Sequence, residues 1–299
     1  MLKKRPLSSY ILFGLLLVLL ACLLLPHVES RSSRIIDAVF NFGHLPLFGV
    51  VALVILWILN HRSWPVSDKR YYFIAFTITF LLGIITEFAQ IFFPERYFEI
   101  KDIIWDTLGA ITFLTLSYPF AENHLKKGTR CKIVSMFIII LAAAPILPAT
   151  IDTISMMKDF PCLGSFESYL EIQRWKANDA EIARSKKNAS HGSYSLRTEL
   201  SPGIYPGISL NYLQGDWRGY DTFSCDVFNP GEKPLRIVVR INDMDHNQEY
   251  DDRFNRGFIL NPGSNTVVID LKEVMEAPKG RMMDIGNIVN ICIFSYNLD

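Results

Sequence analysis

The sequence predicts a polytopic α-helical membrane domain with about five transmembrane helices, followed by an all-β jelly-roll sandwich domain. Half of the 299 residues are hydrophobic, and the mean hydropathy is positive. The pattern changes near residue 150: long apolar runs precede it, whereas short alternating segments separated by Gly, Pro and Asn turns follow it. We therefore expect a transmembrane domain at 1–150, a linker at 151–162 and a β-sandwich domain at 163–299.

Five apolar runs account for the membrane domain, near 10–26, 44–60, 71–93, 103–120 and 131–150. Each approaches the roughly 20 residues that a helix needs to cross a bilayer. The first run follows a basic segment and contains Leu19-Leu20-Ala21-Cys22, which is similar to a lipoprotein cleavage site. Because the run continues through Cys22 to Pro26, we favour an uncleaved anchor over cleavage.

Lys and Arg are distributed unequally between the loops on the two sides of the membrane. Ten of them lie on one side and four on the other. Since the cytoplasmic side carries the excess of Lys and Arg, we expect a multi-pass protein of the cell membrane with a cytoplasmic N-terminus and an extracytoplasmic C-terminal domain. The ten are Lys3, Lys4, Arg5, Arg62, Lys69, Arg70, Lys126, Lys127, Arg130 and Lys132; the four are Arg31, Arg34, Arg96 and Lys101.

Polar residues interrupt the third apolar run, in the stretch "GIITEFAQIFFPERYFEIKD". Gly83, Glu87, Gln90 and Pro94 are spaced by four, three and four residues, so they share one helical face. A carboxylate at the centre of a membrane helix costs about 2.5–3.5 kcal/mol on insertion scales, and such residues often serve a function. Glu87 and Gln90 are therefore candidate site residues.

Two further runs place polar residues at the same expected depth. Asp102 and Asp106 are four residues apart at the start of the fourth run, and His44 begins the second. We expect His44, Gln90, Arg96 and Asp106 to line an outward-facing pocket with Glu87 and Asp102. The alternative is a buried network that only fixes helix packing, with Arg96 as the ion-pair partner of Glu87 or Asp102.

The spacing G-x-x-x-E-x-x-Q-x-x-x-P-x-R…D…G resembles the VanZ-like membrane family, which is associated with teicoplanin resistance. The resemblance covers about residues 40–118 and implies a bacterial envelope protein, but it supplies no reaction. Asp106 departs from the family, which more usually has Asn there. The residues that carry the resemblance are His44, Gly83, Glu87, Gln90, Pro94, Arg96, Asp102 and Gly109.

The sequence pattern predicts many short strands in the C-terminal part. "LRIVVRIN" alternates apolar and polar residues with the period of a half-buried strand. "GSYSLRTEL", "YPGISL", "DWRGYDTFSCDVFNP" and "YDDRFN" together resemble a galactose-binding-like jelly roll, as in carbohydrate-binding modules. The resemblance implies glycan binding and often a structural calcium ion, for which no ligand set follows from the sequence; Glu167 is the residue we name as a guess.

Sugar recognition needs aromatic faces and planar polar groups. Arg236 and Arg240 lie on one face of the "LRIVVRIN" strand, and Asp252 and Arg253 follow in "NDMDHNQEYDDR", so we expect these four residues in a glycan site. "YDDR" has a second interpretation as an internal ion-pair corner. Trp217 precedes a strand and is expected in the core.

The net charge of the C-terminal part indicates which class of ligand it favours. Residues 160–299 contain 15 basic and 19 acidic residues, a net charge of −4, whereas residues 1–159 have a net charge of +4. An acidic outer domain argues against nucleic acid and favours a neutral or weakly charged glycan.

Three functions remain open. The leading hypothesis is an envelope protein in the lipid bilayer that binds a glycan or lipid-linked saccharide at the outer membrane face, through the polar pocket and the tethered β domain. The second is a membrane-embedded enzyme acting on a lipid-linked sugar or phosphate, with Glu87 or Asp102 as general acid or base. The third is a non-catalytic envelope scaffold.

Overall fold

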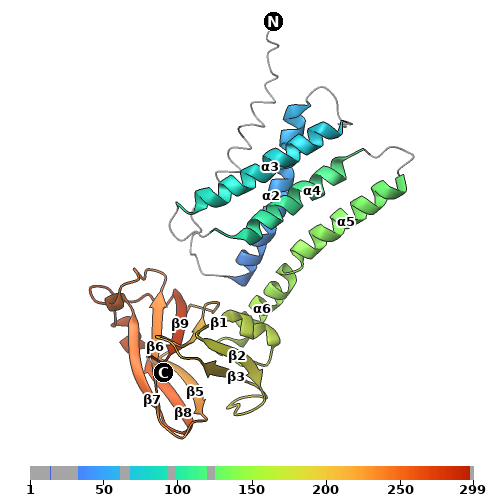
Figure 1. Cartoon of the computed structure of the whole chain (residues 1–299). Helices are drawn as coiled ribbons and strands as arrows, with labels where there is room; N and C mark the ends of the chain where they lie inside the picture. Colours follow the sequence, from blue (N-terminus) through green and yellow to red (C-terminus); the bar gives the residue numbers. More distant parts are fainter. Residues whose placement is uncertain (1–13, 15–32, 61–67, 93–97, 120–124, 297–299) are drawn as a thin grey trace. The chain divides into compact units, whose positions relative to one another are not determined.

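The computed structural model describes residues 14, 33–60, 68–92, 98–119 and 125–296. The chain divides into two compact units (Figure 1). The helical unit comprises Met1–Val28 and Ile36–Leu147, and the β unit comprises Glu29–Ile35 and Pro148–Asp299. The expected first span, 10–26, and with it Cys22, lies outside the described residues apart from the helical Gly14.

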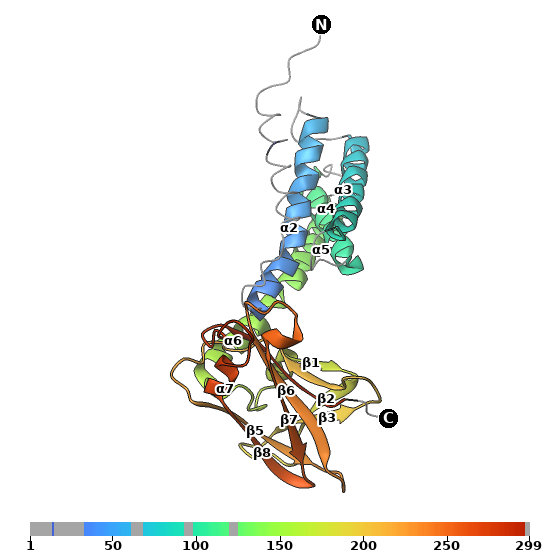
Figure 2. The same ribbon diagram turned by 90° about the vertical axis from the view of Figure 1, so that its left-hand side faces the viewer.

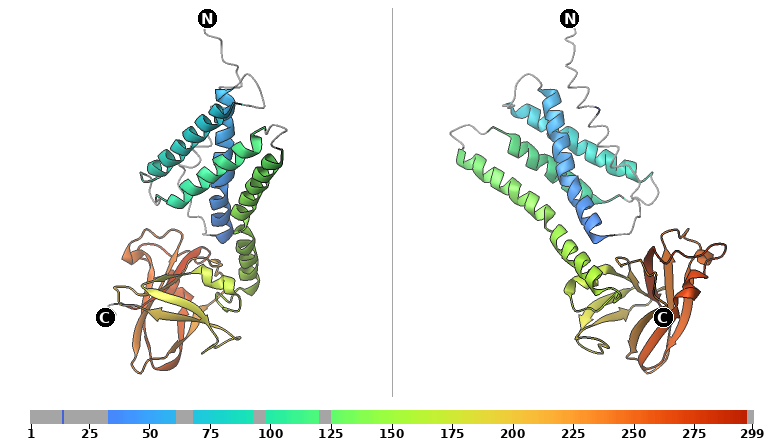
Figure 3. Two further views of the ribbon diagram at one scale, coloured as in Figure 1. Left: turned by 45° about the vertical axis from the view of Figure 1, so that its right-hand side comes forward. Right: turned by 180° about the vertical axis from the view of Figure 1, so that it is seen from behind.

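The described helices of the helical unit pack side by side. They are α2 (Arg34–Leu59, whose first two residues belong to the β unit), α3 (Lys69–Gln90), α4 (Ile100–Ser117) and α5 (Leu125–Ala143). A buried apolar cluster joins α2 to α3 and α4, with Val51, Leu56, Ala75 and Ala110 among its members. Helix α4 packs between α3 and α5, as both views of Figure 3 show.

Three stretches of the described chain are long and apolar enough to cross a membrane: Arg34–Leu59, Lys69–Gln90 and Lys126–Asp159. The prediction of five transmembrane helices is therefore not confirmed. Helix α4, at the expected fourth span, is not among the three, and its 18 residues include Lys101, Asp102 and Asp106. The third stretch includes α5 and continues into α6 (Ile146–Asp159).

The strands of the β unit form three sheets (Figure 2). The largest has five antiparallel strands in the order β1-β4-β9-β6-β7; β5 pairs with β8, and β2 pairs with β3. The bounds are β1 Trp175–Asn178, β2 Ala180–Ser185, β3 Ser195–Leu200, β4 Gly207–Leu210, β5 Thr222–Asn229, β6 Leu235–Asp243, β7 Phe254–Leu260, β8 Gly263–Asp270 and β9 Ile288–Phe294. Short helices occur at η2 (Tyr169–Arg174), η3 (Tyr250–Asp252) and α7 (Leu271–Met275).

The core of the β unit lies between the five-stranded sheet and the β5–β8 pair. Ile237, Val239 and Ile241 of β6 are buried against Val267 and Ile269 of β8 in one apolar cluster. This arrangement is a β sandwich, in which alternate residues of each strand face the core. The expected alternation of "LRIVVRIN" is confirmed, because Ile237, Val239 and Ile241 are inside and Arg236 and Arg240 are on the opposite face. Trp217 is also buried, stacked on Phe223, as expected.

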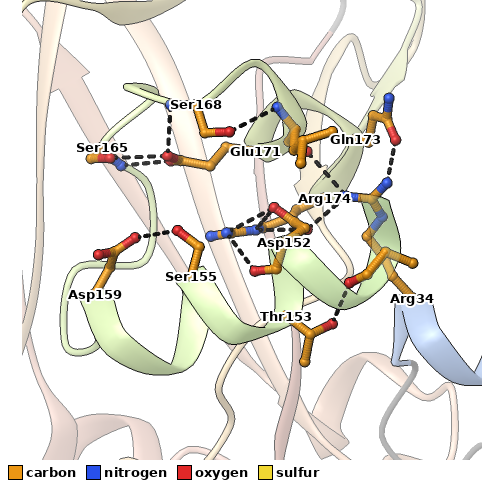
Figure 4. Close-up of polar contacts among 12 residues, drawn as sticks. Arg34, Asp152, Thr153, Ser155, Asp159, Ser165, Ser168, Glu171, Gln173 and Arg174 are labelled. Carbon is orange, nitrogen blue, oxygen red and sulfur yellow. Dashed lines mark hydrogen bonds and ion pairs between the residues drawn. The ribbon is translucent and has the colours of Figure 1, made fainter. Parts of the chain in front are cut away.

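Helix α6 occupies most of the segment that was expected to be a linker, and its C-terminal part belongs to the β unit. Figure 4 shows Asp152 of α6 receiving hydrogen bonds from Arg174 Nε (3.1 Å) and Arg34 Nη1 (2.6 Å). Arg174 is only 1% exposed, and the Asp152 carboxylate is the counter-charge of its guanidinium inside the protein. The domain bounds stay a prediction, but the β unit includes the residues around Asp152.

Candidate functional site

Three helices of the helical unit bring a histidine and two carboxylates together. His44 of α2 and Asp106 of α4 form a hydrogen bond of 2.9 Å between Nδ1 and Oδ1. The other ring nitrogen of His44, Nε2, is 3.7 Å from Asp102 Oδ2. Glu87 of α3 completes the group, since ligand atoms of His44, Glu87 and Asp106 all lie within 4.8 Å of one another. We call His44, Glu87 and Asp106 the acid–histidine cluster.

Glycines permit the close helix packing that forms this cluster. A Cβ atom at Gly109 of α4 would lie 2.1 Å from the backbone oxygen of Leu45, next to His44. A Cβ atom at Gly83 of α3 would lie 3.2 Å from Asp106 Oδ2. Gly109 therefore needs a residue without a side chain for α2 and α4 to approach as they do, whereas a side chain at Gly83 would crowd the Asp106 carboxylate.

Glu87 is fully buried, and the described partner of its carboxylate is a backbone group. The Glu99 N–H, at the N-cap of α4, donates to Glu87 Oε2 (3.2 Å). The expected partner Arg96 lies outside the described residues. Gln90 is buried one turn further along α3, on the face that the spacing predicted. The structure therefore brings His44, Glu87, Asp102 and Asp106 together, but it does not test their roles.

A groove of about 740 Å³ crosses the outer face of the five-stranded sheet in the β unit. Two rows of paired residues form its floor. In the first row Arg240 of β6 is opposite Asn255 of β7 and Cys292 of β9. In the second row Val238 is opposite Gly257 and Phe294, in the same strands. Because Gly257 has no side chain, no side chain covers the β7 end of the second row.

Three donor atoms in the lining of the groove are without a partner in the described part of the chain. Arg240 Nε, Arg253 Nε and Asn255 Nδ2 are buried from solvent, and none of the three atoms has a hydrogen-bond partner among the described residues. Burial lowers the pKa of the Arg240 guanidinium, and the neighbouring charge of Arg253 lowers it further. Such groups gain free energy when a ligand supplies acceptors, because a buried unpaired polar group costs about 1–3 kcal/mol.

Tyrosines stand at the edges of the groove. Tyr205 and Tyr250 are 59% and 67% exposed, respectively. Arg253 lies over the Tyr250 ring at 5.2 Å, and Arg236 lies over the Tyr296 ring at the same distance. Exposed aromatic rings beside polar donors are the two elements that sugar recognition requires.

Asp252 has a different environment from the other three predicted residues. Arg236, Arg240 and Arg253 line the groove, whereas the Asp252 carboxylate bonds Arg281 Nε (2.5 Å) and the backbone N–H of Asn247 (2.8 Å). The hydrogen bond from Arg281 is the main reason that the pKa of Asp252 falls to about 2. At Asp252 the structure favours the interpretation as an ion-pair corner.

Sequence reasoning missed the groove residues on neighbouring strands, Asn255 and Gly257 of β7 and Phe294 of β9. No local pattern identifies them, because they are defined by pairing with β6. Glu167, our guess for calcium, accepts hydrogen bonds from the backbone N–H groups of Ser193 and Tyr194. The calcium ion stays a prediction.

The fold and the site define a two-unit chain, with apolar helices around an acid–histidine cluster and a β sandwich with a basic groove. Residues 7–121 match the model of the VanZ/LLP1 family. This match confirms the resemblance seen in the sequence. The family is membrane-associated, and the matched residues include α2 and α3, which are long and apolar enough to cross a membrane.

Other similarities concern proteins that act on or bind polysaccharides. β-Agarase A of Vibrio sp. (strain JT0107) is 24% identical over 116 residues, which are 39% of this chain and 11% of that enzyme. A family 11 carbohydrate-binding module of Clostridium thermocellum, solved with a β-1,3-1,4-mixed-linked tetrasaccharide, is 17% identical with a TM-score of 0.36, covering 45% of this chain and 85% of the module. The agarase AgWH50C is 17% identical with a TM-score of 0.31, covering 42% of this chain and 21% of the enzyme. These similarities define neither a ligand nor an activity for this chain.

Proposed function

We propose that this protein is a cell-envelope membrane protein that binds a saccharide in the groove of its β unit. The observation that carries the proposal is the set of three unpartnered donors, Arg240 Nε, Arg253 Nε and Asn255 Nδ2, in one groove. Sugar hydroxyl, ring and carboxylate oxygens accept hydrogen bonds, so a saccharide would supply the missing partners. A free or lipid-linked saccharide of the envelope has this chemistry.

The tyrosines support the same ligand class. Tyr205 and Tyr250 are exposed beside the groove, and Tyr205 also contacts Phe294 edge-to-face with ring centroids 5.7 Å apart. A ring fixed by such a contact presents apolar area with little loss of conformational entropy. Tyrosine faces would therefore stack on the apolar C–H faces of sugar rings while the arginines bond the oxygens.

The charge of the groove narrows the saccharide class. Arg236, Arg240, Arg253 and Arg256 line it, and no Asp or Glu is among the described residues that do so. This differs from the net negative charge of the C-terminal domain, on which the expectation of a neutral glycan rested. Guanidinium groups bind carboxylate, sulfate and phosphate oxygens in bidentate geometry. We therefore propose a saccharide with acidic groups.

The location that we propose for the groove is extracytoplasmic. The excess of Lys and Arg in the loops expected on the cytoplasmic side supports this orientation. An alkaline phosphatase reporter, which is active only outside the cytoplasm, should be active when fused after Asp299. An inactive phosphatase fusion, with an active cytoplasmic reporter at the same position, would place the groove inside the cell and contradict the proposal.

A matched pair of ligands tests the binding. Full-length protein in detergent would be titrated calorimetrically with a neutral hexasaccharide and with an oligouronate of the same length. We expect the uronate to bind at least about tenfold more tightly, because each charge-assisted hydrogen bond contributes about 1.5–3 kcal/mol. Equal affinity for both ligands would contradict the acidic class, and no binding to a broad saccharide panel would contradict the saccharide itself.

A further inference from the structure

We propose that the acid–histidine cluster binds a divalent transition-metal ion. The cluster offers one imidazole nitrogen and two carboxylate oxygens from three different helices, and these ligand atoms lie within 4.8 Å of one another. The inference concerns the helical unit alone and does not depend on saccharide binding in the groove.

The distances suit such an ion. Metal–nitrogen and metal–oxygen bonds to zinc are about 2.0–2.2 Å long. With bonds of this length, two ligand atoms are about 3 Å apart in an octahedral site and about 3.4 Å apart in a tetrahedral one. His44 Nδ1 and Asp106 Oδ1 are 2.9 Å apart, so binding of the ion needs only a small separation of the two atoms or an octahedral geometry. The ligand atom of Glu87 lies within 4.8 Å of the other two, and rotation about the terminal bonds of this longer side chain would bring a carboxylate oxygen closer to the same centre.

Two carboxylate oxygens of the acid–histidine cluster are buried. Glu87 is 0% exposed and Asp106 is 2% exposed. Glu87 Oε1 and Asp106 Oδ2 are inaccessible to solvent, and neither accepts a hydrogen bond from the residues that the structure describes. A polar side chain that is buried with an unused acceptor is costly, and an ionised one is more so. Both atoms belong to the cluster and have lone pairs available for a ligand.

The charges of the described residues favour a cation at the cluster. No ion pair joins Glu87 or Asp106 to Lys or Arg within the part of the chain that the structure describes. Asp102 adds a third carboxylate, 3.7 Å from His44 Nε2. Among the described residues, two or three ionised carboxylates beside one histidine carry a net negative charge, and a divalent ion would compensate two of these charges.

The types of ligand atom indicate which metal ions the cluster would favour. Imidazole suits zinc and iron, and carboxylate suits manganese and magnesium, so a mixed set favours Zn²⁺, Mn²⁺ or Fe²⁺. Calcium prefers six to eight oxygen ligands and is disfavoured by the histidine. Among the described residues, the cluster contains no cysteine.

The test uses full-length protein in detergent, stripped with EDTA and titrated with Zn²⁺ and, separately, with Mn²⁺. We expect one high-affinity ion per chain, measured by calorimetry and by elemental analysis after gel filtration. Glu87→Gln should weaken binding by more than about 100-fold, since even outer-sphere partners of metal ligands change affinity 10–100-fold. Glu99→Gln is the matched control, because that carboxylate is exposed and pairs with Lys101; it should bind like wild type.

A second variant protects the test against loss of folded protein. Asp106→Asn keeps an oxygen that can accept from His44 but removes the ionised ligand, and it should also lose the ion. Co²⁺ supplies the spectroscopic readout: the visible bands of the wild-type complex should be absent in both variants. The proposal is overturned if wild-type protein binds neither ion, or if the folded variant binds the ion with wild-type affinity.

Discussion

Arg240 of β6 lies directly opposite Asn255 of β7, and the two side chains place unpartnered buried donors, Nε and Nδ2, in the same groove. Adjacent residues of one face of an antiparallel pair have Cβ atoms about 4.5–5.5 Å apart. Two donors at this spacing can bond neighbouring oxygens of one sugar ring. The pair is therefore the centre of the proposed saccharide site.

Arg240→Met should separate binding from stability. Methionine keeps the apolar stem but removes the donors and the positive charge, so we expect at least about tenfold weaker saccharide binding. The melting temperature should fall only slightly, because removal of a half-buried charge beside Arg253 offsets the lost contact between Arg240 Nη2 and His246 Nε2 (3.2 Å). Calorimetry and a thermal melt measure both. Arg197→Met, on an exposed arginine of β3, is the control and should change neither.

Gly257→Leu should close the groove without unfolding the sheet. A Cβ atom at Gly257 would make only ordinary contacts, the nearest at 3.6 Å from Arg236. At Gly207, also in the groove, it would lie 2.3 Å from the Ile293 backbone oxygen. We therefore expect Gly257→Leu to abolish binding in folded protein and Gly207→Leu to lower the yield of folded protein. Wild-type affinity in Gly257→Leu would place the ligand elsewhere.

Gly109→Ala should disrupt the helical unit, whereas Gly43→Ala should not. The added methyl group at Gly109 meets the Leu45 backbone, which cannot move aside, but nothing lies within 4 Å of a Cβ at Gly43. Alanine is about 0.8–1.0 kcal/mol better than glycine within a helix, so Gly43→Ala should be neutral or stabilising. Thermal melts in detergent compare them, and equal melting temperatures would contradict the close approach of α2 and α4.

Asp152→Asn should destabilise the β unit. It leaves the buried guanidinium of Arg174 without its counter-charge, and loss of one partner of a buried pair costs about 3–5 kcal/mol. Asp159→Asn, on the same helix but exposed, should cost less than about 0.5 kcal/mol. Denaturant unfolding of the full chain, followed by Trp fluorescence, measures both changes. Equal curves for the two variants would contradict a structural role for the Asp152–Arg174 pair.

Acid should weaken the corner formed by Asp252 and Arg281. The pKa of Asp252 is lowered from 3.8 to about 2 in the folded chain. A lowered pKa contributes stability that is complete above the unfolded value and is lost as the pH falls through the folded value. The stability advantage of wild type over Asp252→Asn should therefore be constant above pH about 5 and disappear as the pH falls toward about 2. An advantage that is the same at pH 2.5 and pH 6 would contradict the assignment.

The periodicity of the sequence predicted those site residues that share one face of a single strand or helix. The alternation in β6 placed Arg236 and Arg240 on one face, and the spacing of Gly83, Glu87 and Gln90 placed them along one side of α3. Local patterns suffice for such faces, because the period of a strand or helix is fixed by backbone geometry.

Residues that depend on pairing could not be predicted in this way. Asn255 joins the groove only because β7 pairs with β6 in one particular register, and alternation within β6 does not specify its neighbour. Asp152 pairs with Arg174, which lies 22 residues further along the chain. The sequence around Asp152 alone indicates only the end of an apolar run, because the partner is not nearby in sequence. The contact between Gly109 and Leu45 likewise follows from helix packing.

Hydrogen–deuterium exchange tests the central claim most directly. Full-length protein would be compared with and without a saturating acidic oligosaccharide. The account predicts slower exchange in residues 235–243, 254–260 and 288–294, the strands beneath the groove, and no change in β5 and β8 behind the core. Protection confined to β5 and β8, or no protection at saturation, would contradict a saccharide site in the groove.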